Sequence, residues 1–119
     1  MNLKKVIFYV MCILLFYFVT GYKIAMVSGH SMEPTLTDGE FCILQTRCTL
    51  EDGDIIVIDT TDEPNIPVSS IIKRYIATQS SSDEIYVLGD NRSHSYDSRK
   101  FGRLKRKNVV GKIILTFKI

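Results

Sequence analysis

Cysteine and histidine are scarce in this chain of 119 residues, which has three of the former and two of the latter. Cys42 and Cys48 are six residues apart and lack the spacing of a metal site, and Cys12 lies in an apolar run. A bridge between Cys42 and Cys48 across a hairpin stays open, with two free thiols as the preferred interpretation. The sequence therefore predicts no bound metal, no cofactor and no disulfide scaffold.

An excess of charge is also lacking beyond the first residues. The formal net charge is +2, from 15 lysines and arginines against 13 acidic residues. Because Lys4 and Lys5 come first and every acid follows Lys23, the rest of the chain is neutral, which argues against a nucleic-acid-binding domain. A late group of cations, residues 99–107, is interpreted as a solvated turn or edge strand, or alternatively as a contact for anionic headgroups beside a membrane anchor.

One long apolar run occurs near the N-terminus. Residues 6–22 contain no charge, and Lys4, Lys5 and Lys23 flank them. Seventeen residues are at the short end of what crosses a bilayer as a helix, and the aromatic residues near both ends suit the two interfaces. A cleaved signal peptide fits less well because small residues are missing at a cleavage site. A buried core helix also fits less well, because a helix that is apolar on every side is too large for the core of so small a domain. We expect a cytoplasmic N-terminus over residues 1–5, a membrane-spanning helix over 6–22 and an extracytoplasmic domain over 23–119.

The remaining chain reads as short β-strands separated by turn signals. Strands are expected at residues 23–27, 40–46, 55–59, 68–78, 85–88 and 109–119, with a long polar loop over 89–102. The run at 55–59 is almost wholly apolar, as in a strand buried on both faces. No repeat and no amphipathic helix is evident. The expected fold class is mostly β, a small coiled β-barrel-like domain preceded by one transmembrane helix.

The turn SGHSMEPTL, residues 28–36, is a candidate site for a nucleophile. Pro34 restrains the backbone after Ser31, and Gly29 allows close backbone approach, so the Ser31 side chain would be held in one place. Backbone N–H groups around Ser31 could face a developing oxyanion. An ordinary turn with a capping serine is the competing interpretation.

A serine hydroxyl needs a base, and three residues qualify by type. His30 is adjacent to Ser31 and would point the other way in an extended chain. His94 lies in the polar loop, and a triad with Asp97 or Asp90 is a weaker candidate because it has no positional signature. Lys73 interrupts an apolar strand, where desolvation would lower its pKa and allow the neutral amine to accept a proton. A lysine that extends to the surface from an edge strand is the competing interpretation of Lys73.

Four segments in order resemble the type I signal peptidases, the membrane-bound Ser/Lys proteases that cut signal peptides from exported proteins. They are SMEPTL (31–36), GDIIVI (53–58), IIKRYI (71–76) and VLGDNRSHSYDSRKFG (87–102), and the last is the most specific. Self-cleaving phage-type repressors share the serine and Lys-Arg elements, but they would need a DNA-binding segment where this chain has an anchor. A specialised protease for pilin-like substrates would fit the same segments, as would a catalytically silent membrane-anchored binding module on the same fold.

The resemblance implies a role for each matching residue. Ser31 would be the nucleophile and Lys73 the general base, and Ser95 would hydrogen-bond the lysine amine. Asp97 and Arg99 would form a supporting ion pair, and Asp90 and Asn91 would shape the loop. Beyond the matching residues, we expect the Ser31 N–H and the backbone at Gly29 to form the oxyanion hole. We also expect Met26, Met32, Ile71 and Tyr75 to line the substrate pockets. Partners would be signal-peptide-bearing pre-proteins and the lipid bilayer, with small side chains at the first and third positions before the cut.

The chain departs from the family pattern at three places. Some members carry a serine at the position of Gly29, whose hydroxyl completes the oxyanion hole. The turn Gly-x-Pro-Gly-Asp that usually follows Lys-Arg is replaced by residues 75–84, which contain neither proline nor glycine. The large inserted second domain of some members is absent. Lysine rather than histidine at position 73 indicates the bacterial type.

Overall fold

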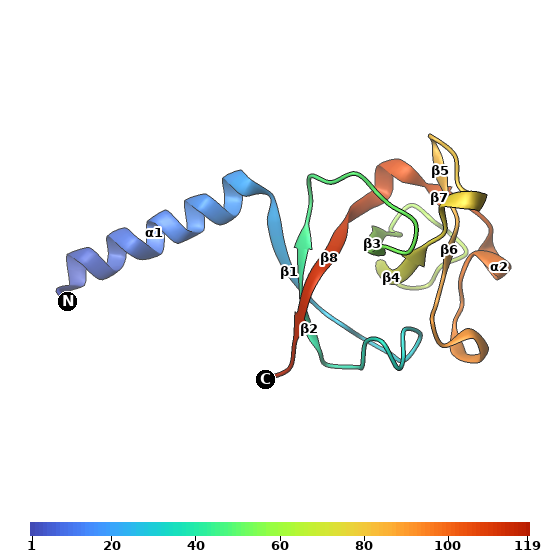
Figure 1. The fold of residues 1–119 in the computed structure, drawn as a ribbon, viewed down its shortest axis with the longest axis horizontal. Coiled ribbons are helices and arrows are strands. Elements are labelled where there is room, and N and C mark those ends of the chain that lie inside the picture. Colours follow the sequence, from blue (N-terminus) through green and yellow to red (C-terminus); the bar gives the residue numbers. More distant parts are fainter.

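A single helix forms the N-terminal end of the protein, whose computed structural model describes residues 1–119. Helix α1 (Leu3–Thr20) begins after Asn2, whose side chain accepts a hydrogen bond from the Lys5 N–H, and ends at Gly21 in the left-handed conformation. It is long and apolar enough to cross a membrane, and none of its residues is buried. It projects away from the rest of the molecule (Figure 1). The expected N-terminal apolar helix is confirmed. It begins three residues before the apolar run begins and ends two residues before that run ends.

The rest of the chain is mostly antiparallel β-structure. The main sheet has the strand order β1-β2-β8-β3-β4-β6, and β5 pairs with β7 in a second, two-stranded sheet. The strands are β1 (Tyr22–Met26), β2 (Phe41–Gln45), β3 (Ile55–Asp59), β4 (Ser70–Tyr75), β5 (Glu84–Ile85), β6 (Val87–Leu88), β7 (Leu104–Lys105) and β8 (Val109–Phe117). Because β1 and β6 each pair with only one neighbour, the hydrogen-bonded sheet is open. The mostly β class is therefore confirmed, and closure into a barrel is not.

The core lies between the sheets, around β3. Ile56, Val57 and Ile58 are all buried, as the uninterrupted apolar run predicts. The largest buried cluster joins Ile56 and Ile58 to five residues that come from the chain after β3: Ile66, Tyr75, Ile85, Val87 and Leu104. A smaller cluster of Val27, Met32 and Leu36 anchors the turn that carries Ser31. Burial of these side chains holds that turn against the sheet.

The prediction of one strand over residues 85–88 is wrong, because two short strands, β5 and β6, lie there in different sheets. Ile85 pairs with Leu104, Val87 pairs with Tyr75, and Tyr86 between them changes sheet. The Tyr86 N–H donates to the Ser80 hydroxyl, and its carbonyl accepts from Ile76. The loop at 89–102 also contains a short helix, α2 (Ser98–Phe101), which the Asp97 side chain caps by accepting from the Arg99 N–H.

The basic group at residues 99–107 lies at the end of the molecule opposite α1, around α2 and β7 (Figure 1). Arg103 and Arg106 donate to the carbonyls of Gln79 and Ser81, and Lys105 pairs with Asp62. The Arg106 guanidinium also stacks over the Tyr75 ring. Arg103, Lys105 and Arg106 therefore stabilise local structure, and the position of the group opposite α1 does not favour headgroup contact beside the anchor.

Candidate active site

A cleft of about 430 Å³ brings together residues that lie far apart in the chain. One wall is the segment that leaves β1 and turns through Ser31, and the other is residues 66–73, which run into β4. Lys73 follows Ser31 by 42 residues, and both residues line this cleft. His94 and Tyr96 of the polar loop also line it. A hydroxyl and a buried amine therefore share one cavity.

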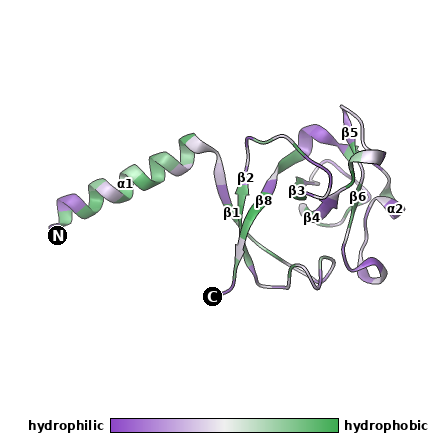
Figure 2. Ribbon diagram, in the orientation of Figure 1, coloured by the Kyte–Doolittle hydropathy of each residue, from purple (hydrophilic) through white to green (hydrophobic).

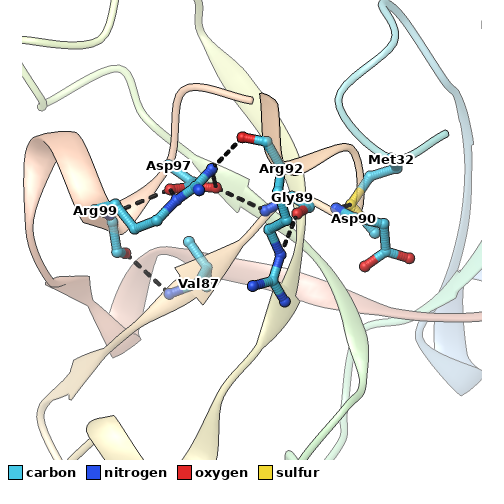
Figure 3. A network of polar contacts seen from close by, with 8 residues as sticks. Met32, Val87, Gly89, Asp90, Arg92, Asp97 and Arg99 are labelled. Carbon is cyan, nitrogen blue, oxygen red and sulfur yellow. Dashed lines mark hydrogen bonds and ion pairs between the residues drawn. The ribbon is translucent and has the colours of Figure 1, made fainter. Parts of the chain in front are cut away.

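The turn that carries Ser31 is held by the loop after β6. The Asn91 N–H donates to the Ser31 carbonyl at 2.8 Å, and the Asn91 side chain donates to the His30 carbonyl at 3.1 Å. The Asp90 N–H points at the Met32 sulfur, 3.4 Å away (Figure 3). Neither the Ser31 N–H nor its hydroxyl forms a hydrogen bond within the protein. Both groups are thus without a hydrogen-bond partner inside the protein.

The Gly29 N–H has a hydrogen-bond partner within the protein, which was not expected. The φ of Gly29, 91°, lies in the region that favours glycine, and its N–H donates to the Asp38 carboxylate at 2.8 Å. Because that N–H is occupied, it does not serve an oxyanion hole. The Ser31 N–H is the unoccupied donor at this turn.

Lys73 is buried on β4, opposite Ile56 of β3. Its side chain is 5% exposed and forms no hydrogen bond or ion pair. Burial lowers the pKa of the amine, and the negative charge of Asp97 opposes this shift only in part. The interpretation of Lys73 as a lysine that extends to the surface is therefore wrong. A buried amine with a depressed pKa is suited to accept a proton.

Ser95 comes close to this region without making the expected hydrogen bond. Its hydroxyl is buried and has no hydrogen-bond partner, so no bond to Lys73 is present. Ser95 packs directly against Gly89, where a Cβ would overlap its side chain. A buried hydroxyl without a hydrogen-bond partner is costly, and the Ser95 side chain also lies near enough to the Asp97 carboxylate to help lower its pKa.

Asp97 organises the loop behind the cleft (Figure 3). It is fully buried and accepts four hydrogen bonds, from the Gly89 N–H, the Arg99 N–H and two nitrogens of the Arg99 guanidinium. Burial alone would raise the pKa of Asp97, but the bonds from Arg99 and Gly89 together lower it. Arg99 also donates to the Arg92 carbonyl. The Asp97–Arg99 ion pair thus has the geometry that the motif implies.

Arg74 is a residue whose role the sequence pattern does not reveal. Its guanidinium donates two bonds to Asp90, at 2.8 and 2.6 Å, and a third to the Gly53 carbonyl at 2.7 Å. Asp90 also accepts from the Thr35 hydroxyl. Arg74 therefore ties the strand that carries Lys73 to the turn that carries Ser31. The Lys-Arg pair is the available signal, but only the fold shows the partner of the arginine.

The two histidines make other contacts. His30 lines the mouth of the cleft, but its Nδ1 pairs with Glu33 at 2.6 Å, a hydrogen bond that raises the pKa of the imidazole. His94 Nδ1 lies 2.8 Å from the Ser93 hydroxyl. Neither imidazole forms a hydrogen bond with Ser31 or an aspartate. The geometry therefore does not favour a Ser/His/Asp triad.

Three of the four expected pocket residues line the cleft. Met26, Met32 and Ile71 do so. Tyr75 does not: it packs in the core, and its hydroxyl accepts a hydrogen bond from Arg106. Tyr75 lies two residues beyond Lys73 on the same side of β4 and is equally buried, but it packs against the core cluster around Ile56 and Ile58.

Comparison with known proteins gives the family. The model of the family described as signal peptidase, peptidase S26, matches residues 1–80 and 79–118. The chain belongs to this family. It is 30% identical over 118 residues to mitochondrial inner membrane protease subunit 1 of Homo sapiens. The matched region covers 81% of this chain and 68% of that protein. It is also 57% identical over 61 residues to signal peptidase I V of Bacillus subtilis, a match that covers 51% of this chain and 28% of that protein. It is 33% identical over 96 residues to signal peptidase I of Bacillus caldolyticus, and that match covers 78% of this chain and 43% of the relative. This family member thus spans about two thirds of the mitochondrial relative and under half of the two bacterial ones.

The stability of this S26 chain is expected to depend on Asp97. Asp97→Asn leaves one acceptor oxygen for four donors, so the free energy of unfolding should fall by about 1–3 kcal/mol at pH 7. Because the folded-state pKa of Asp97 lies below 3.8, its contribution is complete above the unfolded pKa and disappears as the pH falls through the folded one. Urea unfolding of both proteins at pH 7 and at successively lower pH measures the difference.

Asp62→Asn is the matched control for that measurement. Asp62 is a half-exposed carboxylate that pairs with Lys105 and accepts from the Asn108 amide. Because an asparagine oxygen can still accept from Asn108 and the ion pair is exposed, the substitution should leave the free energy of unfolding nearly unchanged. An equal loss in both variants, or a loss at Asp97 that persists unchanged in acid, would show that the buried ion pair is not the cause.

Gly89→Ala is expected to disturb both sides of the site. The new Cβ would overlap the Ser95 side chain and lie 2.8 Å from the Ser31 carbonyl oxygen. Overpacking of this kind costs about 1–3 kcal/mol of unfolding free energy. The double variant Gly89→Ala/Ser95→Gly removes one of the two overlaps and should recover part of the loss in a thermal unfolding experiment. No loss in the single variant would contradict the close packing of these two segments.

Proposed function

We propose that the protein is a membrane-bound serine endopeptidase that cleaves signal peptides from exported pre-proteins with a Ser31/Lys73 dyad. The observation that carries the proposal is the buried, unpaired amine of Lys73 in the same cleft as the uncommitted hydroxyl of Ser31. Membership of the signal peptidase family supports it independently.

The dyad would work in two stages. In the first, the neutral Lys73 amine takes the Ser31 proton as Oγ attacks the scissile carbonyl, and the Ser31 N–H donates to the resulting oxyanion. As the C–N bond breaks, Lys73 gives its proton to the leaving amine, and the acyl group stays on Ser31. In the second, Lys73 deprotonates a water that attacks the ester, and then returns the proton to the Ser31 oxygen. The Ser95 hydroxyl, buried and without a partner, is available to orient the amine.

The substrate would bind as an added strand. Only Arg74 and Tyr75 of β4 pair with β6, so residues 70–73 have no strand partner on that side. These residues line the cleft, and an extended peptide could pair with their free edge. Met26, Met32 and Ile71 would then contact the substrate side chains. We propose that they accept small side chains at the first and third positions before the cut.

The bilayer would be met by α1 and by one face of the sheet. Facing residues of β1, β2 and β8 form two apolar rows, Met26–Phe41–Phe117 and Ile24–Ile43–Leu115. Ile24, Met26 and Leu115 are each more than half exposed, and this part of the sheet is hydrophobic (Figure 2). Because Met26 also lines the cleft, the active site would open beside the membrane. The positive-inside rule would place the N-terminus in the cytoplasm and the domain outside.

Cleavage of a pre-protein in a membrane tests the proposal. The full-length protein is reconstituted in vesicles with a pre-protein that carries alanine at the first and third positions before the junction. Sequencing of the mature N-terminus should show one cut at that junction. A matched pre-protein with phenylalanine at both positions should remain intact. No cut in the first substrate would favour a silent binding module, and equal cutting of both would contradict the assigned pockets.

A further inference from the structure

A second cavity lies where the helix joins the domain, away from the catalytic cleft. Its volume is about 450 Å³, and it is lined by residues from the end of α1, from β1 and from the chain just after β2. Tyr17, Phe18 and Tyr22 contribute aromatic rings, and Lys23 and Arg47 contribute cations. No acidic residue lines it. Neither cation forms an ion pair or a side-chain hydrogen bond.

The walls of this cavity are fixed by hydrogen bonds. The Gly21 carbonyl accepts from both the Thr46 N–H and the Thr46 hydroxyl, and the Ile24 N–H donates to the Tyr17 hydroxyl at 3.1 Å. A Cβ on Gly21 would lie 2.6 Å from the Thr46 hydroxyl and 3.3 Å from the Arg47 side chain. The stem of Arg47 therefore lies against the helix end. Lys23 belongs to the lining of the same cavity.

The position of the cavity relative to a bilayer identifies its ligand. A helix of 18 residues is about 27 Å long, close to the thickness of a hydrocarbon core, so the residues after Thr20 reach the headgroup layer. Aromatic residues such as Tyr17, Phe18 and Tyr22 favour that layer. A guanidinium and an ammonium without carboxylate partners attract a phosphate there, and arginine can bind it through two nitrogens.

We propose that Lys23 and Arg47 bind the phosphate of an anionic phospholipid headgroup on the outer side of the membrane. This site would fasten the helix to β1 and to the end of β2. The inference rests on α1 spanning the bilayer and does not depend on catalysis.

The test measures the affinity of the full-length protein in detergent micelles for dihexanoyl-phosphatidylglycerol, from the shift in its unfolding temperature. The wild type should bind this lipid more tightly than dihexanoyl-phosphatidylcholine or inorganic phosphate. Lys23→Gln and Arg47→Gln should each weaken binding about fivefold. The control variant Lys100→Gln/Lys107→Gln removes exposed cations at the opposite end of the molecule and should bind like the wild type.

Each contrary outcome has a distinct meaning. Equal weakening in the control variant would show a general charge effect and overturn the site. Equal binding of inorganic phosphate would show that the phosphate, and not the lipid, is the ligand, and would also overturn it. Alkaline extraction of membranes tests the spanning helix separately, because a protein that stays in the membrane but lacks the affinity difference contradicts this site alone.

Discussion

Ser31→Ala is expected to lower kcat for pre-protein cleavage by about 10⁴- to 10⁶-fold, because it removes the atom that bonds to the scissile carbonyl. The protein should fold as before, since the Ser31 hydroxyl forms no hydrogen bond within it. Single-turnover cleavage of the reconstituted full-length protein measures the change, and circular dichroism checks the fold.

Ser82→Ala is the matched control for the nucleophile. Ser82 is exposed in the turn between Gln79 and β5, at the end of the molecule far from the cleft. Its removal should leave kcat within about twofold of the wild type, as expected for a surface position. Cleavage by Ser31→Ala at the rate of the control would contradict a serine mechanism at this site.

Lys73→Met is expected to have opposite effects on activity and on stability. Loss of the base should lower kcat by about 10²- to 10⁴-fold. The free energy of unfolding at pH 7 should rise by about 1–3 kcal/mol, because methionine fills a similar volume without an amine that loses its hydration on folding. Cleavage assays and urea unfolding on the same preparation measure both.

The pH dependence separates this base from a histidine base. Because burial lowers the pKa of Lys73, wild-type activity should rise with pH through a value below the 10.5 of an ordinary lysine. In the window between the folded and unfolded pKa the unfolded chain binds more protons, so stability should also rise with pH there, and Lys73→Met should lose that rise. Activity that survives in Lys73→Met but is lost in His94→Ala would instead establish the triad.

The sequence predicts the fold best where one local rule decides. The apolar helix, the strand at 55–59 and the mostly β class follow from hydropathy and turn signals, which act over a few residues. The change of sheet at Tyr86 escapes such rules because it depends on bonds to Ser80 and Ile76 that no periodicity records. Barrel closure depends on how the edges β1 and β6 lie in space, and strand patterns do not encode that.

The candidate site divides in the same way. Ser31 and Lys73 of the motif line one cleft, and Asp97 pairs with Arg99. Two expectations outside the motif differ from the observed contacts, because the Gly29 N–H donates to Asp38 nine residues later and the Tyr75 ring packs in the core. The motif also gives no role for Arg74, because this arginine reaches its partners Asp90 and Gly53 only in the folded chain. Roles set by long-range contacts are those that spacing alone cannot give.

The pairing of β8 with β2 has a practical consequence for protein engineering. Phe117 stacks on Phe41 at the end of the sheet, and the C-terminal Ile119 is fully exposed just beyond the apolar rows (Figure 1). If these rows meet the bilayer as proposed, a purification tag or fluorescent protein fused there would be held against the lipid surface and would hinder access of the substrate. The exposed turn at residues 81–83, at the opposite end of the domain, is the better place for an inserted label.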